Sequence, residues 1–500
     1  MVNSVSVNNP NTTKTSIFYI NDVHSNQKSM QELKTASDAF DTFESSQKVD
    51  KLKFSAGDFT LGTSLPLNKL AVAVQNAMGI MATAGGNHEC DVDRKALVEI
   101  MKDQKFKMLG MNVDISDKDS SDKQIREKLL KSYIQEQGGS KYGVIGLLPF
   151  DFHNHVGDTK EYSNFKIKQL DKVIPDIQKE IETLQQQGVN KIILLSHVGY
   201  ESDSKLAQSL EGVDVIIGGH SHDLIKGITE GKNLFYSKKT GEPTIITQAG
   251  KDGKFFGVLN LEFNEKGVIK TAQNNVSETE AFPKSSLIKY LTEKLLGPSE
   301  VVGSVKTATG SFKRRLIVEN PNASLLTDAM RSELNTDIAF LNAANLRDEF
   351  EVGKLTARDV KNITPFNNKM YTMTVSEKEI VDALKVGAKS MTNHSDRPGL
   401  IQVSGLKYKV NKAGELLDVK VIGKDKTEKT IDINNPSPSN KYTMAIDSFL
   451  CFGLGDSNSL AKIKPTQVFD FDKDKLACDY IKKQATPLEI KADGRIEIVD

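Results

Sequence analysis

Short apolar runs that are typical of β-strands alternate with helical patterns through the first half of this 500-residue chain. Between the later runs, residues 170–184 carry apolar side chains every three or four positions, which is the spacing of an amphipathic helix, and Gly188 follows as a stop signal. Strands that alternate with helices in this way predict an α/β sandwich with mixed sheets. The runs that fit buried strands are 16–20, 52–55, 142–148, 191–195 and 213–217.

The second half of the chain predicts a smaller α+β domain. A helix at 285–296 ends at Gly297-Pro298, a natural boundary, and a second helix is expected at 322–334 with Asn322 or Ser324 as its cap. Two strand pairs should follow, 400–410 with 416–422 and 430–433 with 442–446, whereas the charged stretch 114–123 in the first half is expected in a solvated surface loop. The expected divisions are a flexible tail at 1–15, an α/β domain at 16–280, a linker helix at 281–299 and the α+β domain at 300–500.

The composition excludes several classes of protein. The 66 Lys and Arg residues equal the 66 Asp and Glu residues in number, which speaks against a dedicated nucleic-acid binder because such proteins usually carry a basic surplus. Three cysteines are too few for a disulfide scaffold. No stretch is long and apolar enough to predict a membrane span. The first residues lack the features of a signal peptide, so we expect a cytoplasmic protein, or a periplasmic or extracellular one from which a signal was removed.

Polar residues that can bind metals stand directly after the predicted strands or in glycine-containing turns. In open α/β sheets, adjacent strand ends deliver their loops to one crevice, so these residues are expected to meet. Carboxylate oxygens and imidazole nitrogens together suit a pair of divalent transition metals better than they suit calcium. The set comprises five histidines, two aspartates and one asparagine: Asp22, His24, Asp58, Asn87, His88, His197, His220 and His222.

The order of these motifs resembles that of the calcineurin-like metallophosphoesterases, and within them it is most similar to the 5′-nucleotidases. The segments that carry this resemblance are Asp22-x-His24, Gly57-Asp58, Gly86-Asn87-His88-Glu89, His197 and Gly219-His220-Ser221-His222. Further motifs recur in the order of the 5′-nucleotidase C-terminal domain, at 338–347, 365–368, 402–406 and 448–456. The resemblance implies a four-layer α/β/β/α sandwich followed by a smaller α+β domain that binds the substrate.

The resemblance also implies a ligand set for two divalent ions, chosen among Zn, Mn, Fe, Co and Mg: Asp22, His24 and His222 for one, Asn87, His197 and His220 for the other, and Asp58 as the bridge. His88 would act at the phosphorus centre, either by stabilising the transition state or by protonating the leaving oxygen, and Asp91 would orient its imidazole. The implied reaction is the release of phosphate from nucleoside 5′-monophosphates by in-line attack of a metal-bound hydroxide.

In the second domain, the resemblance implies that Phe366 and Phe449 stack on the base, that Asn342 and Arg347 reach the phosphate or the base edge, and that Asp456 accepts the ribose hydroxyls. The chain departs from the family pattern in three places. Residues 342–347 carry alanines where the family has a glycine-rich turn, the loop at 451–456 is longer, and an upstream arginine is missing, with Arg314 and Arg315 the nearest candidates. These departures bear on the nucleotide pocket and leave the metal ligands intact.

Other functions remain open at this point. The same scaffold could serve a 2′,3′-cyclic-nucleotide phosphodiesterase or a UDP-sugar hydrolase. A non-catalytic nucleotide-binding protein would have lost ligand positions, and none is lost here. We expect a small-molecule nucleotide as substrate, no nucleic-acid partner and no membrane span. We also expect a monomer or homodimer, with a hinge near Gly297-Pro298. His153 and His155 form a further His-x-His that matches no ligand of the family, and they are expected in a surface or outer loop.

Overall fold

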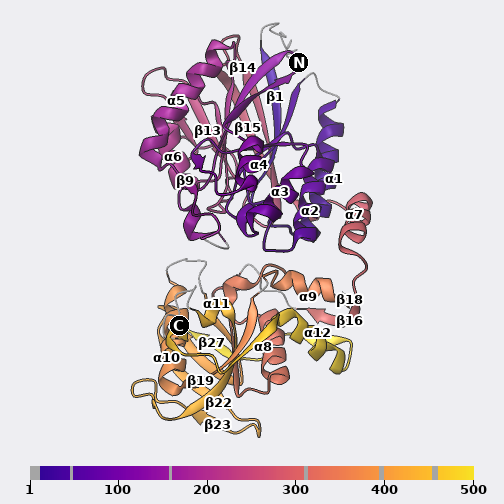
Figure 1. Cartoon of the computed structure of the whole chain (residues 1–500), viewed down its shortest axis with the longest axis vertical. Coiled ribbons are helices and arrows are strands. Elements are labelled where there is room, and N and C mark those ends of the chain that lie inside the picture. The colour runs from indigo at the N-terminus through magenta and orange to yellow at the C-terminus, as the bar shows by residue number, and fades with distance from the viewer. Residues whose placement is uncertain are drawn as a thin grey trace, which may run out of the picture. The chain divides into compact units, whose positions relative to one another are not determined.

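The computed structural model describes residues 12–45, 49–156, 160–308, 314–366, 368–392, 399–452 and 460–500. The chain divides into two compact units, of which the first ends at Gly297 and the second begins at Pro298 (Figure 1). The finer domain ranges expected from the sequence stay predictions. Within the described ranges, none of the helices combines the length and the apolar character that a bilayer crossing requires.

Two mixed sheets form the centre of the first unit. Strands β1 to β4 run parallel to one another, as do β8, β10, β11 and β13, while the outer strands β7, β12, β14 and β15 run antiparallel to their neighbours. In spatial order the first sheet contains β15 (Ile269–Glu278), β14 (Phe255–Phe263), β1 (Thr13–Ile20), β2 (Asp50–Ser55), β3 (Ala82–Ala84), β4 (Lys107–Leu109) and β6 (Leu129–Leu130). The second contains β12 (Leu234–Tyr236), β13 (Pro243–Thr247), β11 (Val215–Gly218), β10 (Ile192–Ser196), β8 (Ser140–Leu147) and β7 (Ser132–Gln137).

Side chains that alternate along the strands define four layers. Ile17 and Tyr19 of β1 belong to the core between the two sheets, whereas Phe18 and Ile20 pack with the helices on the outer face. This alternation follows from the two-residue period of a strand. The outer face of the first sheet is covered by α1 (Gln27–Ser45), α2 (Leu65–Met78) and α3 (Arg94–Lys102), and that of the second sheet by α5 (Leu170–Gln186) and α6 (Tyr200–Ser209). The predicted α/β/β/α sandwich is confirmed.

Shorter elements complete the first unit. A two-stranded sheet pairs β5 (Val113–Ile115) with β9 (Phe165–Ile167), α4 (Ser120–Lys128) follows β5, and α7 (Ser286–Leu296) ends the unit. The expectation of a solvated loop at 114–123 is confirmed for 116–119, which are exposed and lie outside helices and strands, but the two ends of this range belong to β5 and α4. Asp122 is fully buried there, because its carboxylate is paired with Arg94 Nη1 at 2.7 Å, and a paired charge can be buried where an isolated one cannot.

In the part of the second unit that the structure describes, three sheets pack with five α-helices, which agrees with the α+β prediction. The sheets contain, in spatial order, β20 (Ile401–Ser404), β17 (Ile338–Asn342), β24 (Lys441–Asp447), β19 (Lys369–Ser376) and β25 (Gln467–Asp472); β23 (Glu428–Thr430), β22 (Leu416–Ile422), β21 (Leu406–Asn411) and β27 (Ile496–Val499); and β18 (Gly353–Thr356), β16 (Val301–Ala308) and β26 (Leu488–Ile490). The helices are α8 (Pro321–Glu333), α9 (Ala357–Ile363), α10 (Glu377–Ser390), α11 (Ser448–Cys451) and α12 (Lys473–Lys483).

Local predictions in the second unit were wrong in two respects. The cap of α8 is Asn320 rather than Asn322 or Ser324, because Pro321 fits the first helical position and Asn320 accepts hydrogen bonds from the next backbone N–H groups. The run 400–410 is split at Gly405, whose φ is +73°, so that β20 pairs with β17 and only β21 pairs with β22. Likewise β23 pairs with β22, and β24 pairs with β17 and β19, instead of with each other.

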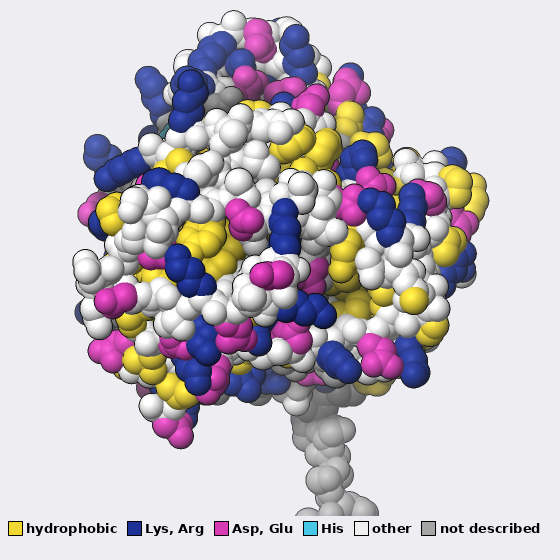
Figure 2. All heavy atoms as spheres, turned by 90° about the horizontal axis from the view of Figure 1, so that it is seen from below, with side chains coloured by type: hydrophobic (Ala, Val, Ile, Leu, Met, Phe, Trp, Pro, Cys, Tyr) yellow, Lys and Arg dark blue, Asp and Glu magenta, His cyan; other side chains and the backbone are white. Residues whose placement is uncertain are grey.

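The charged side chains are interspersed on the face shown in Figure 2, where basic and acidic groups alternate over short distances and hydrophobic side chains form only small groups. A surface of mixed sign fits the formal net charge of zero. This face offers no extended basic stripe of the kind that binds a nucleic-acid backbone.

Candidate metal centre

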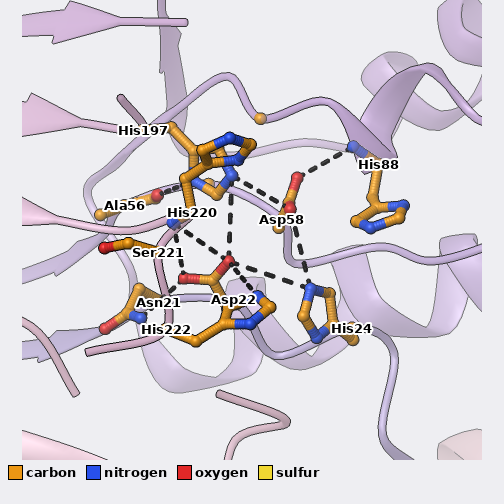
Figure 3. A network of polar contacts seen from close by, with 12 residues as sticks. Asn21, Asp22, His24, Ala56, Asp58, His88, His197, His220, Ser221 and His222 are labelled. Atoms are coloured by element: carbon orange, nitrogen blue, oxygen red, sulfur yellow. Dashed lines mark hydrogen bonds and ion pairs between the residues drawn. The ribbon is translucent and has the colours of Figure 1, made fainter. Parts of the chain in front are cut away.

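Five loops of the first unit, each following a parallel strand, bring their polar side chains to one point (Figure 3). The loop after β1 supplies Asp22 and His24, the loop after β2 supplies Asp58, and the turn after β3 supplies Asn87 and His88. The loops after β10 and β11 supply His197, and His220 with His222. The two sheets thus contribute together to one cluster, because the carboxyl ends of their parallel strands lie at the same edge of the sandwich.

The backbone of these loops takes up a conformation that non-glycine residues seldom adopt. Among the described residues, nine other than glycine have a positive φ, and seven of them belong to the cluster or its immediate support: Asp22, His24, Ser25, Asp58, His220, His222 and Asp252. A left-handed conformation costs about 1–3 kcal/mol at such a residue and concentrates at functional sites. The fold therefore holds these side chains against a local conformational preference.

The two aspartates lie at the centre of the cluster and the histidines surround them. His197 Nε2 is 3.0 Å from Asp58 Oδ2, and His24 Nε2 is 3.7 Å from the same oxygen. His222 Nε2 lies 3.4 Å from Asp22 Oδ1. Three groups have ligand atoms close enough to share an ion, namely Asp22 with His24 and His222, His24 with Asp58 and His88, and Asp58 with His197 and His220. Asp58 thus belongs to two adjacent groups, as a bridging ligand must.

The donor set fits divalent cations. His24 Nε2, His197 Nε2 and Asn87 Oδ1 are buried and make no hydrogen bond, although buried polar atoms are nearly always satisfied. All three are lone-pair donors of the type that borderline metals bind. Asn87 directly precedes His88, whose backbone N–H donates to Asp58 Oδ1 at 2.9 Å. This hydrogen bond holds the turn that carries Asn87 next to Asp58. Two carboxylates surrounded by nitrogen and oxygen atoms with free lone pairs are what a cation site requires.

A further shell of contacts orients the ligands. His24 Nδ1 is 2.9 Å from Asp252 Oδ1, and His197 Nδ1 is 2.6 Å from the carbonyl oxygen of Ala56. Metal-binding histidines commonly donate their second ring N–H to such acceptors, which fixes the tautomer and the ring orientation. Asn21 Nδ2 donates to Asp22 Oδ2 at 2.7 Å. Sequence reasoning missed Asp252, which lies in an ordinary-looking Gly-Lys-Asp-Gly turn.

The electrostatics of the cluster favour bound positive charge. Burial raises the pKa of Asp22, but His197 and His222 lower it to about 2. Burial lowers the pKa of His197, but Asp58 and Asp22 raise it to about 10. The pKa of Asp58 also lies well below its usual range, since the attraction of neighbouring histidines exceeds the cost of its burial. Two buried carboxylates hold their negative charge here only with cationic partners.

Glycine allows two of these loops to pack closely. A Cβ atom on Gly86 would lie 2.1 Å from Asp58 Oδ1, so no other residue fits there without displacing the bridge. Glu89 supports the same turn, because its buried carboxylate accepts the backbone N–H groups of Asp58 at 3.1 Å and Gly86 at 2.8 Å. Burial and the nearby Asp58 raise the pKa of Glu89 to about 7. From the sequence, Glu89 was recognised only as the last residue of the motif Gly86-Asn87-His88-Glu89, and no structural role was predicted for it.

His88 and Asp91, the expected catalytic pair, lie beside the metal ligands. The short helix η1 (His88–Cys90) brings His88 Nδ1 to 2.8 Å from Asp91 Oδ2. The rings of His88 and His24 lie edge to face with centroids 5.2 Å apart. The structure therefore brings together all the aspartates and histidines predicted for the metal centre and places Asn87 next to His88 with a buried Oδ1, while the individual roles of these residues stay predictions.

The structure brings together only some of the residues that are expected to bind the nucleoside. Asn342 is buried at the end of β17, and the guanidinium of Arg347 lies 5.3 Å from the centroid of the Phe366 ring. Phe449 lies in α11, whose cap Asp447 accepts a hydrogen bond from Asn345 at 3.0 Å. Asp456 lies outside the described residues. Of the two candidate upstream arginines, Arg314 is exposed and Arg315 is buried.

Comparison with known families adds independent information. Residues 15–224 match the family described as calcineurin-like phosphoesterase, and residues 301–461 match the family described as 5′-nucleotidase, C-terminal domain. A probable 5′-nucleotidase of Treponema pallidum is 24% identical over 492 residues, which cover 84% of this chain and 81% of that protein. A trifunctional nucleotide phosphoesterase protein, YfkN of Bacillus subtilis, is 26% identical over 480 residues, or 85% of this chain; the chain spans only 31% of that protein's length.

The fold is also shared with a solved structure. The crystal structure of a 5′-nucleotidase precursor from Thermus thermophilus superposes with a TM-score of 0.75 at 24% identity, covering 97% of this chain and 99% of the other. At this identity the likeness shows that the two-domain fold is the same. The chemistry must therefore be argued from the residues of the centre.

Proposed function

Because this chain belongs to the 5′-nucleotidase family, with a metallophosphoesterase domain followed by a 5′-nucleotidase C-terminal domain, we propose that it hydrolyses nucleoside 5′-monophosphates to nucleosides and phosphate. The chain is a phosphohydrolase with a His/Asp metal site. The observation that carries the proposal is Asp58, a buried carboxylate that belongs to two groups of potential metal-binding side chains, one with the buried His24 and one with the buried His197, and so offers a bridge for two ions.

The ligands would be Asp22, His24 and His222 for one ion and Asn87, His197 and His220 for the other. When bound, two divalent ions supply Lewis acidity toward phosphoryl oxygens and lower the pKa of a coordinated water. The position of the phosphoryl group would be set by the chain through Asp22 and Asp58, which are buried and whose loops are joined by backbone hydrogen bonds from Asp22 to Gly57 and from His24 to Asp58.

His88 is the proton donor in this proposal. In the protonated ring, Asp91 accepts the hydrogen on Nδ1, and Nε2 carries the second hydrogen, which it can donate to a phosphoryl or leaving oxygen. The His88 side chain is partly exposed, unlike His24 and His197, so it can reach a substrate that enters from solvent. Its backbone N–H is engaged by Asp58, which ties the position of the donor to that of the bridge.

The second unit would bind the nucleoside. Phe366 and Phe449 are half-buried, so each keeps an accessible surface on which a base can stack. Arg347 lies over Phe366 and places a positive charge beside that ring, and Asn342 Oδ1 is buried without a hydrogen bond. Asp456 would accept the ribose hydroxyls. These contacts would select nucleotides over other phosphate esters.

A second candidate is hydrolysis of 2′,3′-cyclic nucleotides or UDP-sugars at the same centre. It is favoured by the name of the Bacillus relative, a trifunctional nucleotide phosphoesterase, and by the altered segment Asn342–Arg347 of this chain. Two metals and one proton donor do not define the leaving group. The two candidates differ in the substrate that turns over fastest.

The test incubates metal-loaded protein with AMP, UMP, a 2′,3′-cyclic nucleotide or a UDP-sugar, with Mn, Zn, Co or Mg in turn, and separates the products by chromatography. A 5′-monophosphate gives a nucleoside and phosphate, a cyclic nucleotide gives a nucleoside monophosphate, and a UDP-sugar gives UMP and a sugar phosphate. We expect nucleoside 5′-monophosphates to give the highest kcat/KM. The variant Asp58→Ala should abolish product formation, whereas Asp176→Asn on the surface of α5 should match the wild type. Failure of all four substrates with every metal would leave only the non-catalytic nucleotide-binding alternative.

A further inference from the structure

A second His/Asp cluster lies on the outer side of His220. Its members are Asp151, His155 and His220, whose ligand atoms lie within 4.8 Å of one another. His220 Nε2 is 3.0 Å from Asp151 Oδ1, and His155 Nε2 is 2.9 Å from Asp151 Oδ2. His220 therefore belongs both to this cluster and to the group with Asp58 and His197. The His-x-His of residues 153–155 matches no ligand of the family, yet one of its histidines faces the centre.

The contact between His220 and Asp151 determines which ring nitrogen can bind an ion. An ionised carboxylate only accepts hydrogen bonds, so His220 must carry its hydrogen on Nε2. In the neutral ring this leaves the lone pair on Nδ1, and Nδ1 is then the atom available to a metal beside Asp58.

The turn that carries Asp151 is built to hold it in place. Asp151 precedes the short helix η2 (Phe152–Asn154), and Phe152 is fully buried with its ring stacked on Phe165 at a centroid distance of 6.0 Å. His155 follows the helix and occupies the second carboxylate oxygen of Asp151. The rings of His155 and His220 also meet edge to face, with centroids 5.3 Å apart. The two oxygens of the partly exposed Asp151 carboxylate are thus held by His220 and His155.

We propose that Asp151 is a positioning residue for His220, and that His155 holds Asp151 in the orientation that this requires. The inference rests on the proposed function, in which His220 binds a metal. Asp151 would accept the hydrogen of the His220 ring nitrogen that does not bind the metal. Asp252 has this position beside His24, and the Ala56 carbonyl has it beside His197. Its removal should weaken one of the two metal sites and leave the other intact, since Asp151 contacts one ligand only among those of the centre.

The experiment titrates metal-free wild type and the variants Asp151→Ala, Asp151→Asn and His155→Ala with Co²⁺ in a calorimeter. Loss of such an outer partner typically lowers metal affinity by about 10- to 100-fold. We expect a loss of this size for one of two ions in Asp151→Ala and a smaller loss in Asp151→Asn, because an amide oxygen still accepts the Nε2–H of His220. His155→Ala should fall between wild type and Asp151→Ala.

A matched control and a spectroscopic readout separate positioning from a general loss of structure. His153→Ala alters the same turn at a histidine whose Nε2 contacts the Phe165 carbonyl, so it should bind both ions as wild type does. Long-range ¹H–¹⁵N spectra of the zinc-loaded protein should show His220 protonated on Nε2 in wild type. In Asp151→Ala this signal should broaden or move, while the melting temperature of the metal-free protein stays unchanged.

Three results would overturn the inference. Binding of both ions by Asp151→Ala with wild-type affinity would do so, as would protonation of His220 on Nδ1 in the loaded wild type. A third Co²⁺ ion bound by wild type and lost in His155→Ala would show that the outer cluster is itself a metal site. If wild type binds no ion at all, the proposed function fails first, so the two failures can be told apart.

Discussion

His88 Nδ1 lies 2.8 Å from Oδ2 of Asp91, and the same oxygen accepts the backbone N–H of Gly62 at 2.7 Å. Because the hydrogen bond from Gly62 holds the Asp91 carboxylate in place, the carboxylate does not move with the His88 ring and instead determines the orientation of that ring. His88 is further held through its backbone by Asp58, the candidate bridge. The candidate proton donor and the candidate metal centre are thus parts of one hydrogen-bonded unit.

The first prediction concerns this pair. His88→Ala should lower kcat by about 10²- to 10⁴-fold, the usual contribution of a positioned acid or base, with metal content unchanged. Asp91→Asn should lower kcat less, because the imidazole remains but its tautomer is no longer imposed. Steady-state kinetics with AMP together with metal analysis measure both effects. Equal kcat values for wild type and His88→Ala would contradict the role of His88.

Metal removal should affect both activity and stability. All the possible metal-binding groups among the described residues lie in the first unit, so chelation should abolish hydrolysis and destabilise that unit alone. An ion at 100 times its Kd stabilises the native state by about 2.7 kcal/mol. Hydrogen exchange with and without Mn²⁺ should show protection in β1, β2 and β10. A similar change throughout the second unit would argue against this localisation.

The nucleoside contacts can be tested at Phe366. Stacking of a base on an aromatic ring contributes about 1–3 kcal/mol, so Phe366→Ala should raise KM for AMP by about 5- to 150-fold. The same variant should leave KM for a phosphate ester without a base unchanged. Phe43→Ala, at an exposed phenylalanine of α1, is the matched control. A parallel rise of KM for both substrates would show that Phe366 supports the fold instead of the base.

A stability prediction comes from the interior of the second unit. Lys473 and Asp447 are both fully buried and form an ion pair at 3.1 Å, and Asp447 also accepts hydrogen bonds from Asn345. Lys473→Met leaves the carboxylate without its charge partner and should cost about 3–5 kcal/mol in urea unfolding. The double variant with Asp447→Asn should recover part of this loss. Lys475→Met, which breaks the exposed pair with Asp479, should cost about 1 kcal/mol or less.

Some features of the fold could be predicted with confidence from the sequence because they depend on local periodicity. The strand runs and the helix at 170–184 were found within a few residues of β1, β2, β8, β10, β11 and α5. Of the strand pairings predicted in the second unit, only that of 406–410 with 416–421 is confirmed, and the others were wrong because strand partners are chosen by burial over long distances in the chain. The residues around Gly405 contain no pattern that predicts the passage of the chain from one sheet to another between β20 and β21.

For the candidate site, the sequence by itself determined which side chains can act as ligands and that strand ends would bring them together, because this follows from motif order and from the geometry of parallel strands. Only the tertiary structure decided how each ligand is held. Asp252 is separated from His24 by 228 residues in the sequence, and between Asp151 and His220 lie the elements β9, α5, β10, α6 and β11. Such partners leave no local pattern, since a hydrogen bond between distant segments depends on the packing of loops and not on spacing along the chain.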